Sequence, residues 1–372
     1  MASVEDRWWS RDAAGRRVRT ERYGTGLRWR ATWHEDGGAR RRRSFPTKDA
    51  AQAHLEDVGA SQRAGTYVSP DRGAITVAEM AERWYRAQVH QRASSLEAVR
   101  RRLDRTVLPT LGSGTLADLD RSAVQDAVTE WSTRLAPGTV RNAYVYLAGV
   151  CSLAVEERRI VSTPCRRINL PPDAEKLIDP LPIGKVQDLV DALWVPYRPM
   201  AALIVASGVR PGEARGLTGD RVVPIEGGAR VRIDRQMVSR NSCRPEWGPL
   251  KTPASYRTLS IGAVALEQLG PLDDGLVLTT GQGRVITRGM ASSAWRAAAA
   301  KVGLPTGSGW HDLRHFHASK LIAGGSSPRA VASRLGHKDP TETLRTYAHL
   351  WPDDDDRMRD ATDGLIVLPD AA

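Results

Sequence analysis

Leu335-Gly-His337-Lys-Asp-Pro-Thr-Glu-Thr-Leu-Arg-Thr346-Tyr347-Ala-His349 combines one tyrosine with several basic side chains near the C-terminus. Two further motifs precede it, His311-Asp-Leu-Arg314-His315 and Ser207-Gly-Val-Arg210-Pro-Gly-Glu213. Guanidinium groups bind phosphate oxygens through paired donors, and a tyrosine hydroxyl is a nucleophile that can form a covalent intermediate. Together, the three motifs indicate attack on a phosphodiester by a phenolic oxygen.

The composition indicates a nucleic acid as the substrate. The chain has 372 residues, a formal net charge of +11 and a pI near 9.9. This charge favours double-stranded DNA as the partner, although a basic soluble protein with solvated arginines is an alternative. Cys151, Cys165 and Cys243 are too scattered for a disulfide framework or a zinc site and are typical of a reducing cytoplasm. No signal peptide is visible, and the most apolar stretch, Met200 to Val209, is too short to span a membrane.

The first segment carries most of the excess positive charge. From Arg11 to Lys48 there are twelve Lys or Arg residues against four Asp or Glu. Apolar alternation predicts strands over 27–33 and 39–45, and Thr47 is suited to cap a following helix. We expect a small sheet backed by one helix, with arginines on its open face. The candidate DNA-binding residues are Arg28, Arg30, Arg40, Arg41, Arg42 and Arg43.

Two alternatives remain open for this segment. It is either folded or a flexible basic tail. Trp29, Trp33 and Phe45 favour the folded form, because a flexible tail has no core in which aromatic side chains are buried. Its arginines either read a groove or only hold phosphates.

The next segment predicts a compact bundle of four amphipathic helices. Thr76-Val-Ala-Glu79 and Ser94-Ser-Leu-Glu97 have the pattern of capping boxes, and we expect Pro109 to end the helix that the second box opens. Asp120 is expected to begin a third helix, and Pro137-Gly138-Thr139 to separate it from the fourth.

A proline-rich linker from Pro164 to Pro182 leads into a mixed region, with strand patterns at 230–235 and 256–261 among helices that dominate up to Tyr347. The sequence therefore predicts a multidomain, mainly α protein with small β elements. We expect a basic domain over 1–70, a helical domain over 74–170 and a mixed, mainly α domain over 175–372. The tail from Ala361 is either a loose end or a segment that docks on a neighbouring protomer, which its apolar run 365–368 favours.

The motifs resemble those of the tyrosine recombinase (phage integrase) family. The match is specific at 206–217, 311–319 and 335–349, and weaker at Leu250-Lys251-Thr-Pro-Ala-Ser255-Tyr-Arg257, where such families place a lysine on a β-hairpin turn. The resemblance implies a catalytic domain over roughly 179–350, a preceding core-binding domain and a basic arm-binding domain of the kind found in larger integrases. It also implies an integrase that cleaves and rejoins DNA through a 3′-phosphotyrosyl intermediate, integrating and excising a phage genome or mobile element.

The candidate catalytic residues are Arg210, Lys251, His311, Arg314, His337 and Tyr347. The two arginines are suited to clamp the negative charge that develops on the non-bridging oxygens, and His337 to donate a further hydrogen bond. Tyr347 supplies the nucleophile, and we expect neighbouring cations to favour its phenolate. Lys251 protonates the departing 5′-oxygen as general acid. The resemblance implies that His311 helps to take the phenolic proton and that Glu213 supports the site.

The predicted chemistry uses no cofactor and no metal, because a covalent phosphotyrosine retains the energy of the broken bond. No Walker motif, Asp-x-Asp metal site or zinc spacing is present in the sequence. The resemblance implies a homotetramer on attachment-site DNA, with an accessory directionality factor and a host DNA-bending protein as further partners. We expect it to act in the cytoplasm of a bacterial cell, at the nucleoid.

Several alternatives accompany this interpretation. Tyr256 is a competing nucleophile, although its strand-like surroundings favour core or edge packing. His311 and His315 have a spacing that suits a metal but lack the glutamate of H-E-x-x-H. His317 has no assigned role. The alternative functions for the whole chain are a recombinase-like DNA-binding regulator without strand exchange and a type IB topoisomerase-like enzyme.

Overall fold

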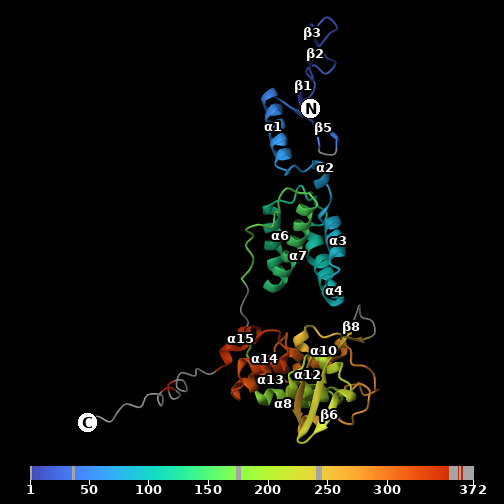
Figure 1. The fold of residues 1–372 in the computed structure, drawn as a ribbon, viewed down its shortest axis with the longest axis vertical. Helices are drawn as coiled ribbons and strands as arrows, with labels where there is room; N and C mark the ends of the chain where they lie inside the picture. The colour runs from blue at the N-terminus through green and yellow to red at the C-terminus, as the bar shows by residue number, and fades with distance from the viewer. Residues whose placement is uncertain are drawn as a thin grey trace, which may run out of the picture. The chain divides into compact units, whose positions relative to one another are not determined.

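The computed structural model describes residues 2–35, 38–172, 177–239 and 245–351, together with Arg359 and Thr362. The chain divides into two compact units, residues 1–174 and 175–372 (Figure 1). Cys243 and the apolar run 365–368 lie outside the described residues. In the part that the structure describes, no helix is long and apolar enough to cross a membrane.

The first unit begins with a three-stranded antiparallel sheet in the order β1-β4-β5, formed by Ser3–Asp6, Trp29–His34 and Arg40–Phe45. Helix α1, Lys48–Arg63, packs against one face, and Thr47 caps it by accepting a hydrogen bond from the Ala50 amide. Between β1 and β4 the chain forms a second hairpin of β2, Trp9–Arg11, and β3, Arg17–Arg19. The prediction of a folded segment, rather than a basic tail, is confirmed.

Strand alternation divides the predicted arginines between the two faces of this sheet. The residues of β4 that pack against α1 have Arg41 and Arg43 as cross-strand partners, so these two arginines lie on the helix side. Arg40 and Arg42, one residue out of step, lie on the open face with Arg30. The expectation that the whole arginine run lines the open face is therefore wrong for Arg41 and Arg43.

The rest of the first unit is a helical bundle whose core includes the fully buried Trp131. A short α2, Pro70–Gly73, precedes α3, Val77–Ala87, which begins at the predicted Thr76–Glu79 capping box. Asp120 caps α6, Arg121–Arg134, and α7, Pro137–Glu156, has its proline in the first turn. The starts of α3 and α6 agree with the sequence pattern, whereas Pro137-Gly138-Thr139, expected to separate the third and fourth helices, form the first turn of α7.

The second helix of the bundle differs from its prediction at both ends. The N-cap of α4, Ala93–Arg102, is Arg92, so Ser94 lies inside the helix and forms no capping box. Pro109 does not end the helix, because the chain passes through a π-turn, η1 (Leu103–Val107), and continues as α5, Leu108–Leu111. There the Leu108 amide donates to the Leu103 carbonyl, five residues back. This wider turn accommodates the proline ring that a regular α-turn would exclude.

The second unit is mainly helical and has a three-stranded antiparallel sheet in the order β10-β7-β6. Its strands are β6, Val222–Ile225, β7, Gly228–Ile233, and β10, Arg257–Gly262. β7 and β10 correspond to the strands predicted at 230–235 and 256–261. The connection between them contains a further hairpin of β8, Gln236–Ser239, and β9, Pro245–Gly248, and then the short η4, Pro253–Ser255.

Helix α13, Trp310–Ala323, connects the main core of this unit with the C-terminal helices. Its residues Leu313 and Phe316 belong to the main core, while Ala318 and Ile322 pack with α14, Pro328–Leu335, and α15, Pro340–Tyr347. Figure 1 shows α13, α14 and α15 together in red and orange. The remaining helices are α8 (Ile183–Ala192), η2 (Val195–Tyr197), α9 (Arg198–Ser207), α10 (Pro211–Arg215), η3 (Gly219–Arg221), α11 (Ala263–Leu269), α12 (Arg288–Lys301) and η5 (Ala348–Leu350).

Candidate active site

The turn between α9 and α10 places Arg210 at the start of α10. α9 ends at Gly208, whose φ of +67° is left-handed, and a Cβ there would lie 2.5 Å from a histidine ring of α13. The turn therefore requires glycine. The Arg210 side chain donates to Oε1 of Glu213 at 2.9 Å and to Oγ of Ser255 at 3.2 Å. A third hydrogen bond, 3.2 Å long, reaches the carbonyl of Gly336.

Arg314 lies in the middle of α13 with 5% of its surface exposed. Its Nη1 donates to the Gly208 carbonyl at 2.6 Å, and its Nη2 donates to the Leu335 carbonyl at 2.8 Å. Burial, reinforced by the positive charge of Arg210, lowers the pKa of Arg314 to about 9. The guanidinium group is therefore still charged at neutral pH, while its hydrogen bonds to carbonyl groups leave that charge available to an anion.

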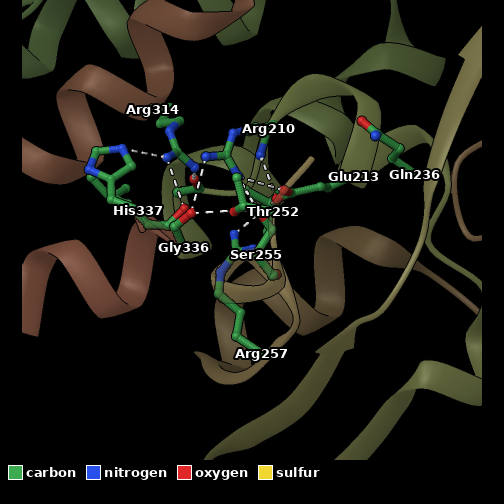
Figure 2. A network of polar contacts seen from close by, with 12 residues as sticks. Arg210, Glu213, Gln236, Thr252, Ser255, Arg257, Arg314, Gly336 and His337 are labelled. Carbon is green, nitrogen blue, oxygen red and sulfur yellow. Dashed lines mark hydrogen bonds and ion pairs between the residues drawn. The ribbon is translucent and has the colours of Figure 1, made fainter. Parts of the chain in front are cut away.

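The two arginines meet at the C-terminal end of α14 (Figure 2). Arg314 binds the carbonyl of Leu335, and Arg210 binds the carbonyl of the next residue, Gly336. The last carbonyls of a helix lack partners within the helix and carry partial negative charge, so they hold cations well. This helix end therefore keeps two guanidinium groups from distant parts of the chain side by side.

A buried ion pair between Glu213 and Arg257 supports Arg210. Oε2 of Glu213 accepts a hydrogen bond from Nη2 of Arg257 at 2.9 Å, and the two side chains are 2% and 8% exposed. Arg257 also donates to the carbonyl groups of Arg334 and Ser255. Burial alone would raise the pKa of Glu213, but Arg257 and Arg210 outweigh it, and the pKa is lowered. Glu213 therefore stays ionised, which fits the supporting role that the resemblance implies.

His337 is oriented by two hydrogen bonds that fix its tautomer. Its Nε2 lies 3.0 Å from Nη2 of Arg314, which can only donate, so Nε2 is the unprotonated nitrogen. Nδ1 carries the proton and donates it to Oγ1 of Thr343 at 2.8 Å. Burial, followed by the positive charge of Arg314 and Arg210, lowers the pKa of His337 to about 4. Here the ring is a neutral acceptor, and it can donate to a phosphate only after it gains a proton or changes tautomer.

Tyr347 lies in the apolar cluster that α13, α14 and α15 form, and 1% of its surface is exposed. Its hydroxyl lies 2.7 Å from Nδ1 of His315. Burial raises the pKa of Tyr347 to about 12, although the charge of Arg314 acts in the opposite direction. The expectation that neighbouring cations favour the phenolate is wrong for this state, because the cost of burying the charge outweighs their attraction.

His311 and Lys251 are both exposed to solvent. His311 is in the first turn of α13, three residues before Arg314 and on the same side of the helix. Partial desolvation and then the positive charge of Arg314 lower the pKa of His311. The desolvation is only partial because the residue is exposed. Lys251 is exposed in the connection from β9 to β10, next to Thr252, whose hydroxyl lies 2.9 Å from that of Ser255.

The structure explains two residues whose roles the sequence left open. His317 is buried, and its Nδ1 donates to the Val205 carbonyl at 2.8 Å, which ties α13 to the end of α9. Tyr256 is 49% exposed just before β10, an edge strand of its sheet, so of the two expected placements the core is wrong and the edge is confirmed.

Sequence reasoning missed three residues that bind the candidate catalytic groups. Ser255 was within reach, because it lies in the weak fourth motif with Lys251. Thr343 precedes Tyr347 by four residues and so shares its face of α15, which is the only signal it gives. His315 directly follows Arg314 in the sequence, but no sequence pattern indicates that its ring contacts the tyrosine hydroxyl.

Comparison with known proteins identifies the family. The phage integrase family profile matches residues 181–353, which contain every candidate catalytic residue. Residues 181–353 are a phage integrase family domain, and the chain is homologous to integrases and tyrosine recombinases. It is accordingly a site-specific recombinase, an enzyme that cuts DNA strands and rejoins them. The comparisons give no support to the two alternative functions.

The sequence of this tyrosine recombinase is similar to those of a phage integrase and of a bacterial recombinase. The integrase of Mycobacterium phage L5 is 24% identical over 254 residues, which cover 65% of this chain and 67% of the phage protein. Tyrosine recombinase XerD of Corynebacterium glutamicum is 25% identical over 237 residues, covering 59% of this chain and 72% of that protein.

Solved structures confirm the tyrosine recombinase fold. The Tn1549 transposon integrase, in complex with a circular intermediate DNA, is similar with a TM-score of 0.65 at 16% identity, covering 78% of this chain and 100% of that one. A lambda integrase tetramer bound to a Holliday junction is similar with a TM-score of 0.58 at 14% identity, covering 84% and 94% of the two chains.

Proposed function

We propose that this tyrosine recombinase cleaves its DNA with Tyr347 and holds the 3′-end as a phosphotyrosine before the strand is rejoined. The convergence of Arg210 and Arg314 on the end of α14 carries the proposal, because α15, the helix that bears Tyr347, follows directly in the chain. Two adjacent guanidinium groups offer paired donors to the oxygens of one phosphodiester.

The residues of the chain supply every group that this step needs. The phenolic oxygen forms a bond to phosphorus while the bond from phosphorus to the 5′-oxygen breaks. His311 takes the phenolic proton, and Lys251 gives a proton to the departing oxygen. Arg210, Arg314 and a donating His337 hold the non-bridging oxygens, on which negative charge develops. Attack of a 5′-hydroxyl on the phosphotyrosine reverses the step and rejoins the DNA.

We propose further that the enzyme integrates and excises a phage genome or mobile element. The phage L5 and Tn1549 relatives are integrases, and lambda integrase forms a tetramer on a Holliday junction. Exchange between two duplexes cuts four strands, so a homotetramer on attachment-site DNA supplies one active site for each. An accessory directionality factor and a host DNA-bending protein complete the proposed assembly, which acts on the nucleoid in the bacterial cytoplasm.

In this proposal residues 1–70 form an arm-type DNA-binding domain and residues 74–170 a core-binding domain. DNA contacts in the first domain fall to the arginines on its open sheet face, Arg30, Arg40 and Arg42. Arg28 and Arg41 have another task, because they are held in ion pairs with Asp6 and Glu35, each 2.8 Å long. These two arginines stabilise the domain.

A trapping experiment tests the proposed nucleophile. The full chain is incubated with a nicked duplex that carries the crossover site, so that the short strand beyond the cut diffuses away and the covalent adduct accumulates. We expect the adduct with the wild-type protein and none with Tyr347→Phe. An adduct that persists in the variant, or a peptide other than that of Tyr347 bearing the nucleotide by mass spectrometry, contradicts the proposal.

A further inference from the structure

The hydroxyl of Tyr347 and the ring of His315 form a pair that the proposed mechanism does not use. The two atoms in contact, Oη of Tyr347 and Nδ1 of His315, are 2.7 Å apart. Within the described residues the phenolic oxygen has no other hydrogen-bond partner. A buried donor without an acceptor is costly, so the phenol must donate and Nδ1 must accept. His315 then carries its ring proton on Nε2.

Both members of this pair are neutral at neutral pH. Burial raises the pKa of Tyr347 to about 12, so the phenol keeps its proton. Burial also lowers the pKa of His315, further lowered by Arg314 and only partly offset by Asp312, so the imidazole stays unprotonated. The hydrogen bond is therefore present at neutral pH.

The hydroxyl of Tyr347 is bound by His315 and not by the two arginines of the proposed phosphate site, within the described residues. Neighbouring residues of an α-helix point about 100° apart. On α13, Arg314 accordingly reaches the end of α14 while His315 reaches Tyr347. The tyrosine is 1% exposed, whereas the Arg210 side chain is 22% exposed and accessible to a phosphate. In the part of the chain described, neither arginine forms a hydrogen bond with the phenol.

We propose that His315 is a positioning residue that holds Tyr347 in a buried resting place, and that this hydrogen bond must break after DNA has bound and before cleavage. The inference rests on the proposed role of Tyr347 as the nucleophile. It assigns the imidazole the task of an acceptor in the resting enzyme and leaves proton transfer during attack to another group. One helix, α13, then carries both part of the phosphate clamp and the hold on the nucleophile.

Two substitutions of His315 separate holding from proton transfer. His315→Asn keeps an acceptor oxygen close to the position of Nδ1 but cannot take up a proton. His315→Phe fills a similar volume and removes the acceptor. The readout is the first-order rate of adduct formation by the full chain on a saturating nicked duplex that carries the crossover site. Thermal unfolding of each variant verifies that it is folded, and Tyr347→Phe on the same duplex tests the proposed function separately.

We expect His315→Phe to form the adduct about fivefold faster than the wild type, which corresponds to the loss of one ordinary net hydrogen bond. His315→Asn should stay within about twofold of the wild type. In the DNA-free wild type, ¹⁵N chemical shifts of the histidine rings should show His315 protonated at Nε2 alone.

Other outcomes overturn the inference while leaving Tyr347 as the nucleophile. Adduct formation that is slower in both variants would show that His315 accepts the proton during attack. A rate in His315→Phe equal to that of the wild type would show that the hydrogen bond does not hold the tyrosine. Equal acceleration by both variants would show that the acceptor atom is irrelevant. If the wild type itself forms no adduct through Tyr347, the proposed function fails instead.

Discussion

Nε2 of His337 accepts a hydrogen bond from Nη2 of Arg314 at 3.0 Å, and the other ring nitrogen donates to Thr343 at 2.8 Å. One histidine thus joins the phosphate clamp to α15, the helix of the nucleophile. Thr343 is fully buried, and its hydroxyl can both donate and accept. When a phosphate needs a proton from Nε2, Thr343 can rotate its hydroxyl and donate to Nδ1, so the tautomer can change without moving the ring.

Thr343→Val therefore should slow cleavage. Valine preserves the shape but removes the hydroxyl that has to donate to Nδ1 when Nε2 gives its proton to a phosphate, so the donating tautomer loses its hydrogen bond, at a cost of about 1–3 kcal/mol. We expect the rate of adduct formation to fall about tenfold and Thr343→Ser to restore most of it. Thr346→Val is the matched control, because within the described residues its hydroxyl bonds the Glu342 carbonyl of the same helix and no other group. Equal rates in the valine and serine variants at position 343 would contradict this role.

Stability should fall in acid because of His317. Burial lowers its pKa from 6.5 to about 4, so between these pH values the unfolded chain binds the proton more readily than the folded one. The contribution of His317 to the free energy of unfolding is therefore fully present above pH 6.5. It decreases as the pH falls towards 4, by about 3 kcal/mol in all.

Urea unfolding of the full chain at pH 7 and pH 5 measures this effect. His317→Asn keeps an N–H donor for the Val205 carbonyl but cannot titrate. Its loss of stability on acidification should be about 2 kcal/mol smaller than that of the wild type. His349→Asn, at an exposed histidine, serves as the control and should lose as much as the wild type. If His317→Asn loses as much stability between pH 7 and pH 5 as the wild type, the acid-sensitive group lies elsewhere.

The sequence predicted the elements and motifs that depend on neighbouring residues. The cap at Asp120 and the strand pattern of β7 and β10 are local signals, and the structure has both of them. Relations between distant segments were not predictable. No pattern near residue 335 indicates that two arginines from other parts of the chain will share its helix end.

The errors have the same origin. Pro109 was expected to break its helix because the sequence does not show that a π-turn will widen the preceding turn. The phenolate of Tyr347 was expected to be favoured because the motifs place cations nearby, while burial of the ring depends on the packing of α13, α14 and α15. Both outcomes depend on tertiary context.

Lys251 can be tested through its leaving group. If it protonates the departing 5′-oxygen, Lys251→Ala should slow cleavage of an ordinary phosphodiester about 10²-fold or more, the usual contribution of a general acid. In a substrate with sulfur in place of the bridging 5′-oxygen, the departing thiolate needs no proton. The variant should therefore cleave this substrate at nearly the wild-type rate. Lys301→Ala, at an exposed lysine of α12, is the control. If sulfur fails to rescue Lys251→Ala, the lysine only positions the DNA.

The two faces of the N-terminal sheet should differ in their contribution to DNA binding. Arg40 and Arg42 lie on the open face, whereas Arg43 of the same strand lies on the helix side, where its guanidinium stacks over Phe45. Each phosphate contact contributes about 0.9 to the slope of log affinity against log salt concentration. The double variant Arg40→Gln/Arg42→Gln should therefore lower the slope on random-sequence duplex DNA by about 1.8, and Arg43→Gln by much less. A loss of slope in Arg43→Gln as large as half that of the double variant would mean that net charge, not the open face, governs binding.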